Sequence, residues 1–140
     1  MAKKRVLVLV PVALDKNGLA NRRTQQNSVE LGTDIEFDYR PIKAGPALYD
    51  SYHDFALADG AMFEAGISAE EDGYGAVCID TMSDSGVNAL RSVLDIPIIA
   101  PAKASYPMCL LLGSNFGVLT QWDRWNIIYK KNPAGIWPGL

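Results

Sequence analysis

The sequence contains few of the residues that proteins use to bind metal ions or to form disulfides. It has 2 cysteines and 1 histidine among 140 residues, and Cys78 and Cys109 each stand in an apolar stretch. Two cysteines this far apart in the sequence fit neither a disulfide framework nor a cysteine-rich zinc site. A single histidine, His53, also leaves a zinc site without enough nitrogen ligands. We therefore expect no metal and no disulfide.

Long apolar runs and an excess of positive charge are also missing. The longest run, residues 6–14, is interrupted by Pro11 and is far shorter than the roughly 20 residues that a membrane-spanning helix needs. No small-residue cleavage site follows it, which argues against a signal peptide. The 13 basic and 16 acidic residues give a net charge of −3, and no continuous basic stripe is present to bind nucleic acid. We expect a cytoplasmic protein without a membrane or nucleic-acid partner.

Glycine-rich phosphate-binding motifs are absent as well. The turn after the first apolar run contains only Gly18, and no segment matches G-x-G-x-x-G or G-x-x-x-x-G-K. A mononucleotide site of the flavodoxin type stays open, because the loops of such sites are rich in serine and threonine. The prediction that we adopt is nevertheless a protein without a cofactor.

What the sequence does contain is a regular alternation of short apolar runs and helical patterns. The run at residues 5–12 is continuous in Val and Leu, which is typical of a strand that is covered on both faces of a parallel sheet. Further strands are predicted at 34–42, 76–79, 96–100 and 116–120, and helices at 19–31, 51–66, 87–93, 104–112 and 122–131.

This βαβαβαβαβα order predicts an α/β fold with a doubly wound, mostly parallel sheet. We expect one domain over residues 1–131. Residues 132–140 are predicted to form an irregular tail, because Pro133 stops the last helix.

Ligands of such sheets bind beyond the carboxyl ends of the strands, which directs attention to the loops at 11–18, 42–46, 80–86 and 101–105. The loop after the third strand contains Thr81, Ser83, Asp84 and Ser85 ahead of a predicted helix. Backbone N–H groups at that helix start could hold an anion. Alternatively, Ser83, Asp84 or Ser85 simply caps the helix that begins at Val87.

Several segments in their order and spacing resemble the aspartate/glutamate racemase superfamily, and within it the hydantoin and allantoin racemase branch. The resemblance extends from about residue 5 to about 131 and rests on the strand that ends in Pro11 and on the segments 44–47, 73–76, 84–91, 96–98 and 116–120. Tyr52 and Asp54 belong to the same pattern.

The resemblance implies one flavodoxin-like half of an enzyme that has two similar α/β halves and needs no cofactor. Such enzymes invert a carbon atom next to a carbonyl group with two cysteines, one taking a proton and one delivering it. The implied substrate is a small carboxylate or cyclic amide, held by Pro11, Thr81, Met82 and Ser83. We also expect a homo-oligomer.

The sequence departs from this pattern at both catalytic cysteines. Thr81 occupies the position that resembles the first of them, three residues before Asp84-Ser85-Gly86. A threonine hydroxyl can form a hydrogen bond with a substrate oxygen, but it is too weak an acid to exchange protons as cysteine does. The chain resembles only the first half, so the second cysteine is not represented. Thr81 is our candidate for the position at the reacting centre.

Two alternatives follow from these departures. One is a catalytically silent, truncated binding or interaction domain. The other is the branch of the superfamily with one cysteine, which includes arylmalonate decarboxylase and maleate isomerase. In that branch, hydroxyls and backbone amides of this loop hold a carboxylate. Cys78 lies three residues before Thr81, and we interpret it as a core thiol that does not react.

The other candidates have simpler interpretations. We expect Cys109 to lie in the core, His53 to be a surface residue rather than a proton shuttle, and Lys103 to be exposed rather than to attract a carboxylate. Trp122, Trp125 and Ile128 form a helical stripe that should be either core or a face for a missing half.

Overall fold

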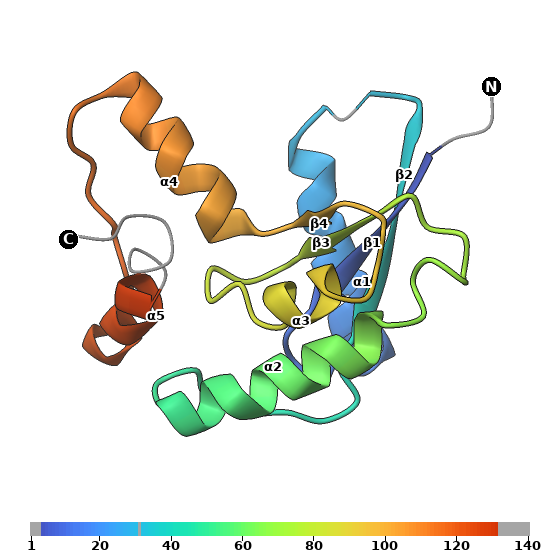
Figure 1. Ribbon diagram of the computed structural model, residues 1–140, viewed down its shortest axis with the longest axis horizontal. Helices are drawn as coiled ribbons and strands as arrows, with labels where there is room; N and C mark the ends of the chain where they lie inside the picture. The colour runs from blue at the N-terminus through green and yellow to red at the C-terminus, as the bar shows by residue number, and fades with distance from the viewer. Residues whose placement is uncertain (1–3, 31, 132–140) are drawn as a thin grey trace.

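The computed structural model describes residues 4–30 and 32–131. Within this part, strands and helices alternate as the sequence predicts (Figure 1). The strands are β1 (Lys4–Val10), β2 (Ile35–Pro41), β3 (Ala76–Ile79) and β4 (Ile98–Ile99). The α-helices are α1 (Lys16–Thr24), α2 (Tyr52–Gly66), α3 (Val87–Arg91), α4 (Pro101–Leu112) and α5 (Asn126–Lys131), and short 3-10 helices span Gln25–Ser28 and Asp123–Trp125. The predicted tail at 132–140 lies outside the described residues.

The four strands form one parallel sheet in the order β2-β1-β3-β4. Val8 of β1 pairs with Tyr39 of β2 on one side and with Cys78 of β3 on the other. The chain leaves β1 and β3 toward opposite sides of the sheet, which makes the carboxyl edge at these two strands the position where open α/β sheets bind ligands. The predicted α/β class and parallel sheet are confirmed.

Helices cover both faces of the sheet. Alternate residues of β1 and β3, among them Leu7, Leu9 and Ile79, pack against α2 and α3 in the main core. The opposite face carries Val8, Tyr39 and Cys78 and lies under α1: the charge of Arg22 in α1 acts on Tyr39. The sheet therefore has helices on both of its faces, as a doubly wound sheet does.

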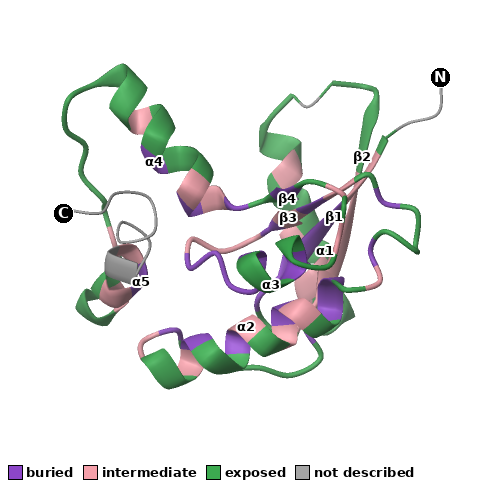
Figure 2. Cartoon of the chain, in the orientation of Figure 1, coloured by how far each residue is buried: buried purple, intermediate pink, exposed green. Residues whose placement is uncertain are grey.

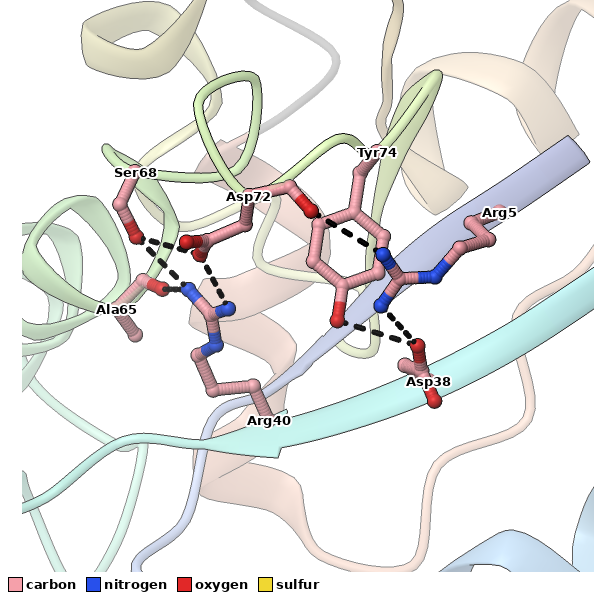
Figure 3. A network of polar contacts seen from close by, with 7 residues as sticks. All are labelled: Arg5, Asp38, Arg40, Ala65, Ser68, Asp72 and Tyr74. Carbon is pink, nitrogen blue, oxygen red and sulfur yellow. Dashed lines mark hydrogen bonds and ion pairs between the residues drawn. The ribbon is translucent and has the colours of Figure 1, made fainter.

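A polar network ties the turn after α2 to the sheet (Figure 3). Arg5 of β1 donates to the Asp38 carboxylate at 2.8 Å, and Arg40 of β2 donates to the Asp72 carboxylate at 2.7 Å. The Tyr74 ring lies between the two arginines, with its centroid 4.3 Å from the guanidinium of Arg5 and 5.8 Å from that of Arg40. Cation–π contacts thus support the two ion pairs.

The predicted fifth strand at 116–120 is wrong, because no strand is present there. A strand needs a neighbour to complete its backbone hydrogen bonds, and this segment runs from the far end of α4 to α5, away from the sheet edge at β4 (Figure 1). The apolar composition of the segment indicated a strand, but it carries no information on whether a partner strand is within reach.

Helix boundaries also differ from the sequence prediction. Helix α1 begins at Lys16, because the side chain of Asp15 caps it by accepting from the Gly18 N–H at 2.7 Å. Residues 15–18 read equally as a turn, since turns and N-caps favour the same residue types. Helix α4 begins at Pro101, so the region 101–105 is helical rather than a loop.

Helix α4 projects from the body of the molecule. Its first turns hold the buried residues Ala102 and Tyr106, whereas its far end is exposed (Figure 2). Leu111 and Leu112 are 80% and 85% exposed, and Leu119 in the following segment is 98% exposed. Cys109 is half-buried, so the prediction of a core position is wrong for this part of the helix.

Candidate functional site

A hollow of about 210 Å³ opens beside the loop that follows β3. Thr81 and Met82 contribute from this loop, Tyr49 from the segment before α2, and three residues from the C-terminal helical region. Its lining residues are Tyr49, Thr81, Met82, Trp125, Ile128 and Tyr129. Two of the four predicted site residues therefore lie in one hollow near the carboxyl edge of the sheet.

The hydroxyls of the loop form a short chain. Thr81 Oγ1 shares a hydrogen bond with Ser83 Oγ at 3.1 Å and accepts from the Ser83 N–H at 3.3 Å. Ser83 Oγ in turn shares a hydrogen bond with Ser85 Oγ at 2.8 Å. Ser83 is buried, whereas Thr81 is half-buried and borders the hollow. Of the two predicted hydroxyls, Thr81 borders the hollow, and the buried Ser83 forms hydrogen bonds with it.

Pro11, the remaining predicted residue, reaches this hollow through a hydrogen bond. It is buried, and its carbonyl oxygen accepts from the Tyr49 hydroxyl at 2.5 Å. Burial raises the pKa of Tyr49 to about 12, and the nearby Asp59 and Asp54 carboxylates add to the rise, so Tyr49 stays a neutral donor. Pro11 itself lines a second hollow that lies along α1.

The predicted capping of the helix at Val87 is wrong. Its N-cap is Gly86, at φ 76°, without a side-chain hydrogen bond. The Gly86 N–H donates to Asp59 Oδ1 at 3.0 Å and the Val87 N–H to the Asp84 carbonyl at 3.3 Å. These two N–H groups already have acceptors, and an anion at this helix start stays a prediction.

Asp84 instead caps α4, 18 residues further along the chain. Its two carboxylate oxygens accept from the N–H groups of Ala102 at 3.0 Å and Lys103 at 3.1 Å. Asp84 has a left-handed backbone conformation with φ 49° and is buried. Burial raises its pKa, although the two backbone hydrogen bonds act in the opposite direction. Asp84 thus joins the candidate loop to the projecting helix.

Neither cysteine lines the hollow that contains Thr81. Cys78 lies within β3, half-buried, on the sheet face under α1, and its thiol is 3.9 Å from the Ile79 carbonyl oxygen. Burial raises the pKa of the Cys78 thiol, and the charge of Asp80 raises it further. Both effects lower the fraction of reactive thiolate, whereas the predicted core position of Cys78 is wrong, because the residue is half-buried.

The minor candidates have the following positions. The His53 side chain is 77% exposed and interacts with Asp54 at 3.4 Å, which confirms a surface residue. Lys103 Nζ donates to Asn88 Oδ1 at 3.1 Å. Ile128 is buried with Tyr49, Phe55 and Ala58, and Trp125 packs on this cluster. The predicted stripe therefore contributes to a core, while Trp122 is partly exposed.

Sequence reasoning missed Tyr49, Tyr129 and the ion pair between Arg22 and Asp80. Tyr49 and Tyr129 belong to different segments that only the tertiary fold brings together, so no local pattern signals them. Arg22 Nε donates to Asp80 Oδ2 at 2.5 Å, and each residue is unremarkable in its own segment. In the part of the chain that the structure describes, no cluster of three or more His, Cys, Asp or Glu residues could hold a metal ion. None of its helices has the length and hydropathy to cross a bilayer.

Comparison with solved structures identifies the architecture. The fold superposes on allantoin racemase from Klebsiella pneumoniae with a TM-score of 0.81 and 20% identity, covering 96% of this chain and 54% of that one. Allantoin racemase from Pseudomonas fluorescens gives 0.79 and 18%, covering 95% of this chain and 56% of that one. The present chain thus corresponds to about half of these proteins.

The sequence comparisons agree with the structural ones. The chain is 35% identical over 82 residues to a hydantoin racemase from Pseudomonas sp. (strain NS671), covering 59% of this chain and 33% of the relative. The chain thus spans about a third of the length of this curated relative. The family model described as "Asp/Glu/Hydantoin racemase" matches residues 20–134. The match covers most of the chain, which therefore belongs to the Asp/Glu/hydantoin racemase family.

Proposed function

We propose that this chain forms the substrate-binding part of a cofactor-independent racemase or isomerase site for a small carboxylate or cyclic amide. The observation that supports this most directly is the hollow in which Thr81 and Met82 meet Tyr49 and Trp125 at the carboxyl edge of the sheet. Ligands of open α/β sheets bind at this edge. Membership in the Asp/Glu/hydantoin racemase family supports the choice of this ligand class.

The groups around the hollow suit a small ring or acid that carries a carbonyl group. The Thr81 hydroxyl can donate to a substrate oxygen while it accepts from the Ser83 N–H. Met82, Trp125 and Ile128 supply apolar walls. The indole N–H of Trp125 is buried without a hydrogen-bond partner in the described residues.

Proton exchange at the substrate carbon needs a base that this site does not contain. Thr81 is a hydroxyl, and the Cys78 thiol lies in β3 with a raised pKa. Donation to a carbonyl oxygen stabilises the enolate that forms on proton loss, but the hydroxyl cannot remove the proton itself. We therefore infer that this chain alone binds the substrate and leaves its configuration unchanged.

A second candidate is a binding domain without catalytic activity. Two observations favour a silent binding domain. Threonine occupies the position of the family's first cysteine, and the pKa of the Cys78 thiol is raised. Both functions require ligand binding next to Thr81. They differ in whether a thiol at position 81 would be placed correctly for proton exchange.

The test combines binding and exchange measurements. We expect 5-methylhydantoin to shift the ¹³C methyl resonance of Met82, and Thr81→Ala to weaken binding by about 2- to 10-fold, the range for one neutral hydrogen bond. Thr81→Ser, which keeps the hydroxyl, is the matched control. Absence of binding to the wild-type chain would refute the proposal.

Exchange of the α-proton in deuterated water distinguishes the two functions. The wild-type chain should show no exchange with 5-methylhydantoin. Thr81→Cys should show slow exchange at pH 8 to 9, because a thiol has a pKa of about 8.5. If Thr81→Cys binds the ligand without exchange, a silent binding domain is the better description. Wild-type exchange that vanishes in Thr81→Ala would contradict our account of the threonine.

A further inference from the structure

The hollow along α1 is separate from the one at Thr81 and has different chemistry. It has a volume of about 350 Å³ and lies between the loop after β1 and helix α1. Pro11, Val12 and Leu14 form its apolar side. Asn21, Arg22 and Gln25 bring two amides and a guanidinium group to the same space. Such a mixture of an apolar wall and a few convergent polar groups is typical of small-molecule sites.

Arg22 is held in place from one side only. Its Nε donates to Asp80 Oδ2 at 2.5 Å. Asp80 directly follows β3, and its N–H donates to the Leu9 carbonyl oxygen at 2.9 Å, which fixes the acceptor to the sheet. The Arg22 side chain is 32% exposed. Among the described residues, neither of its terminal nitrogens has a hydrogen-bond partner, so the end of the guanidinium group is available to a ligand.

This arrangement is suited to a carboxylate. A guanidinium group binds a carboxylate through two parallel N–H donors, and prior fixation at Nε lowers the entropy that binding costs. Asp80 balances the charge of Arg22, and the neighbouring Arg23 acts on the Asp38 carboxylate. Hydrogen-bond geometry at the free end of Arg22, rather than a surplus of positive charge, therefore favours a carboxylate. Asn21 and Gln25 can hydrogen-bond an amide or ureido group on the same ligand.

The ion pair of Arg22 connects the hollow along α1 to the loop after β3. Arg22 comes from the helix after β1, and Asp80 opens the loop that contains Thr81. The two hollows are also linked by the hydrogen bond from Tyr49 to Pro11. The loop after β1 thus lines one hollow and the loop after β3 lines the other, at the sheet edge where the strand order reverses.

We propose that the hollow along α1 is an anion subsite in which Arg22, oriented by Asp80, binds the carboxylate of a small acid that carries an amide or ureido group. The inference deepens the proposed function by naming the residue that selects acids over neutral rings. Asp80 is a positioning residue in this scheme, because it acts on the ligand through Arg22.

The experiment uses two probes and two reporters in the full chain. Malonate and N-carbamoylglycinate are the anionic probes, and hydantoin is the neutral one. The ¹⁵Nε–H resonance of Arg22 reports on the anion subsite, and the Met82 methyl resonance reports on the hollow at Thr81. Both anions should shift the Arg22 signal, whereas hydantoin should shift only the Met82 signal.

Substitution of Arg22 supplies the decisive comparison. Arg22→Gln should weaken malonate binding on the order of 10- to 100-fold, the range for losing charge-assisted hydrogen bonds. Arg22→Lys keeps the charge but lacks the planar guanidinium, so its malonate affinity should lie between those of wild type and Arg22→Gln. Arg124→Gln is the matched control. Arg124 also pairs with a carboxylate, that of Asp50 at 2.9 Å, but its side chain is 69% exposed and lies outside the hollow along α1. It should leave malonate binding unchanged.

The two proposals fail in different ways. If malonate does not shift the Arg22 resonance, or binds Arg22→Gln and wild type equally, the anion subsite is wrong, whatever hydantoin does. If hydantoin leaves Met82 unchanged while malonate binding depends on Arg22, the subsite stands and the proposed function at Thr81 fails. Circular dichroism of each variant verifies that the comparison is made on folded protein.

Discussion

The hydrogen bonds from α4 to Asp84 should determine how firmly the projecting helix is attached. Asp84→Ala removes both acceptors, so the N–H groups of Ala102 and Lys103 lose their partners. Loss of an N-cap costs about 0.5–2 kcal/mol, and a buried donor without an acceptor costs about 1–3 kcal/mol. Because the Lys103 donor is only partly buried, we expect a loss of about 2 kcal/mol in the free energy of unfolding.

Urea denaturation followed by circular dichroism measures this loss, and amide hydrogen exchange at Ala102 and Lys103 locates it. Asp84→Gly is the matched control, because glycine also lacks the carboxylate but adopts φ 49° without strain. It should be less destabilised than Asp84→Ala by about 1 kcal/mol. An Asp84→Ala variant as stable as wild type, with unchanged protection of these amides, would refute the capping role.

The effect of pH on this comparison has a definite sign. Burial raises the pKa of Asp84, so the ionised form is less favourable in the folded protein than in the unfolded chain. Its titration therefore contributes stability that is fully present below the unfolded-state pKa and is lost as pH rises through the folded-state pKa. The advantage of wild type over Asp84→Ala should shrink as pH rises across this interval. An advantage that grows with pH would contradict the direction of the shift.

Three further predictions concern other parts of the fold. Gly86→Ala should destabilise the protein by about 2–4 kcal/mol in urea denaturation, because Gly86 has φ 76° and an added Cβ would lie 2.9 Å from Met62 Cβ. Gly60→Ala, with open space around the added atom, is the control and should not destabilise the protein. Asp38→Asn should lower the free energy of unfolding by about 0.5 kcal/mol near neutral pH. The Arg5 hydrogen bond lowers the pKa of Asp38, so this stabilisation is lost as pH falls through the folded-state pKa and the effect of the substitution should be smaller in acid. An equal effect in acid would contradict this prediction. Leu111→Asp together with Leu119→Asp should shift the chain toward the monomer in sedimentation velocity, and a wild-type chain that is already monomeric would refute self-association.

The sequence predicts the site where the chemistry is local. The run at 76–79 is recognisable as a strand from its own residues, and the rule for carboxyl edges then places Thr81 and Met82 at the edge of the sheet, where they line a hollow. By contrast, Tyr49 and Tyr129 reach the same hollow from segments far apart in the sequence. Their positions depend on how α2 and α5 pack, which no local periodicity encodes.

The capping aspartate shows the same division between local and tertiary information. An aspartate just before a predicted helix normally caps that helix, because the nearest free N–H groups are two or three residues away. Asp84 turns to α4 instead, since Gly86 takes the left-handed position at the start of α3 and Asp59 accepts from its N–H. The α4 N–H groups and Asp59 belong to other elements of the fold, so the sequence pattern alone favours the wrong helix.

The exposed end of α4 bears on both proposals. The far turns of α4 and the segment after it present Leu111, Leu112 and Leu119 to solvent, and because exposed apolar side chains are typical of interaction surfaces, we expect this region to mediate self-association. Helix α5, which follows the exposed segment, forms one wall of the hollow at Thr81. Self-association through this surface would therefore shield the hollow, and hydantoin affinity at Thr81 should rise with protein concentration as the dimer forms.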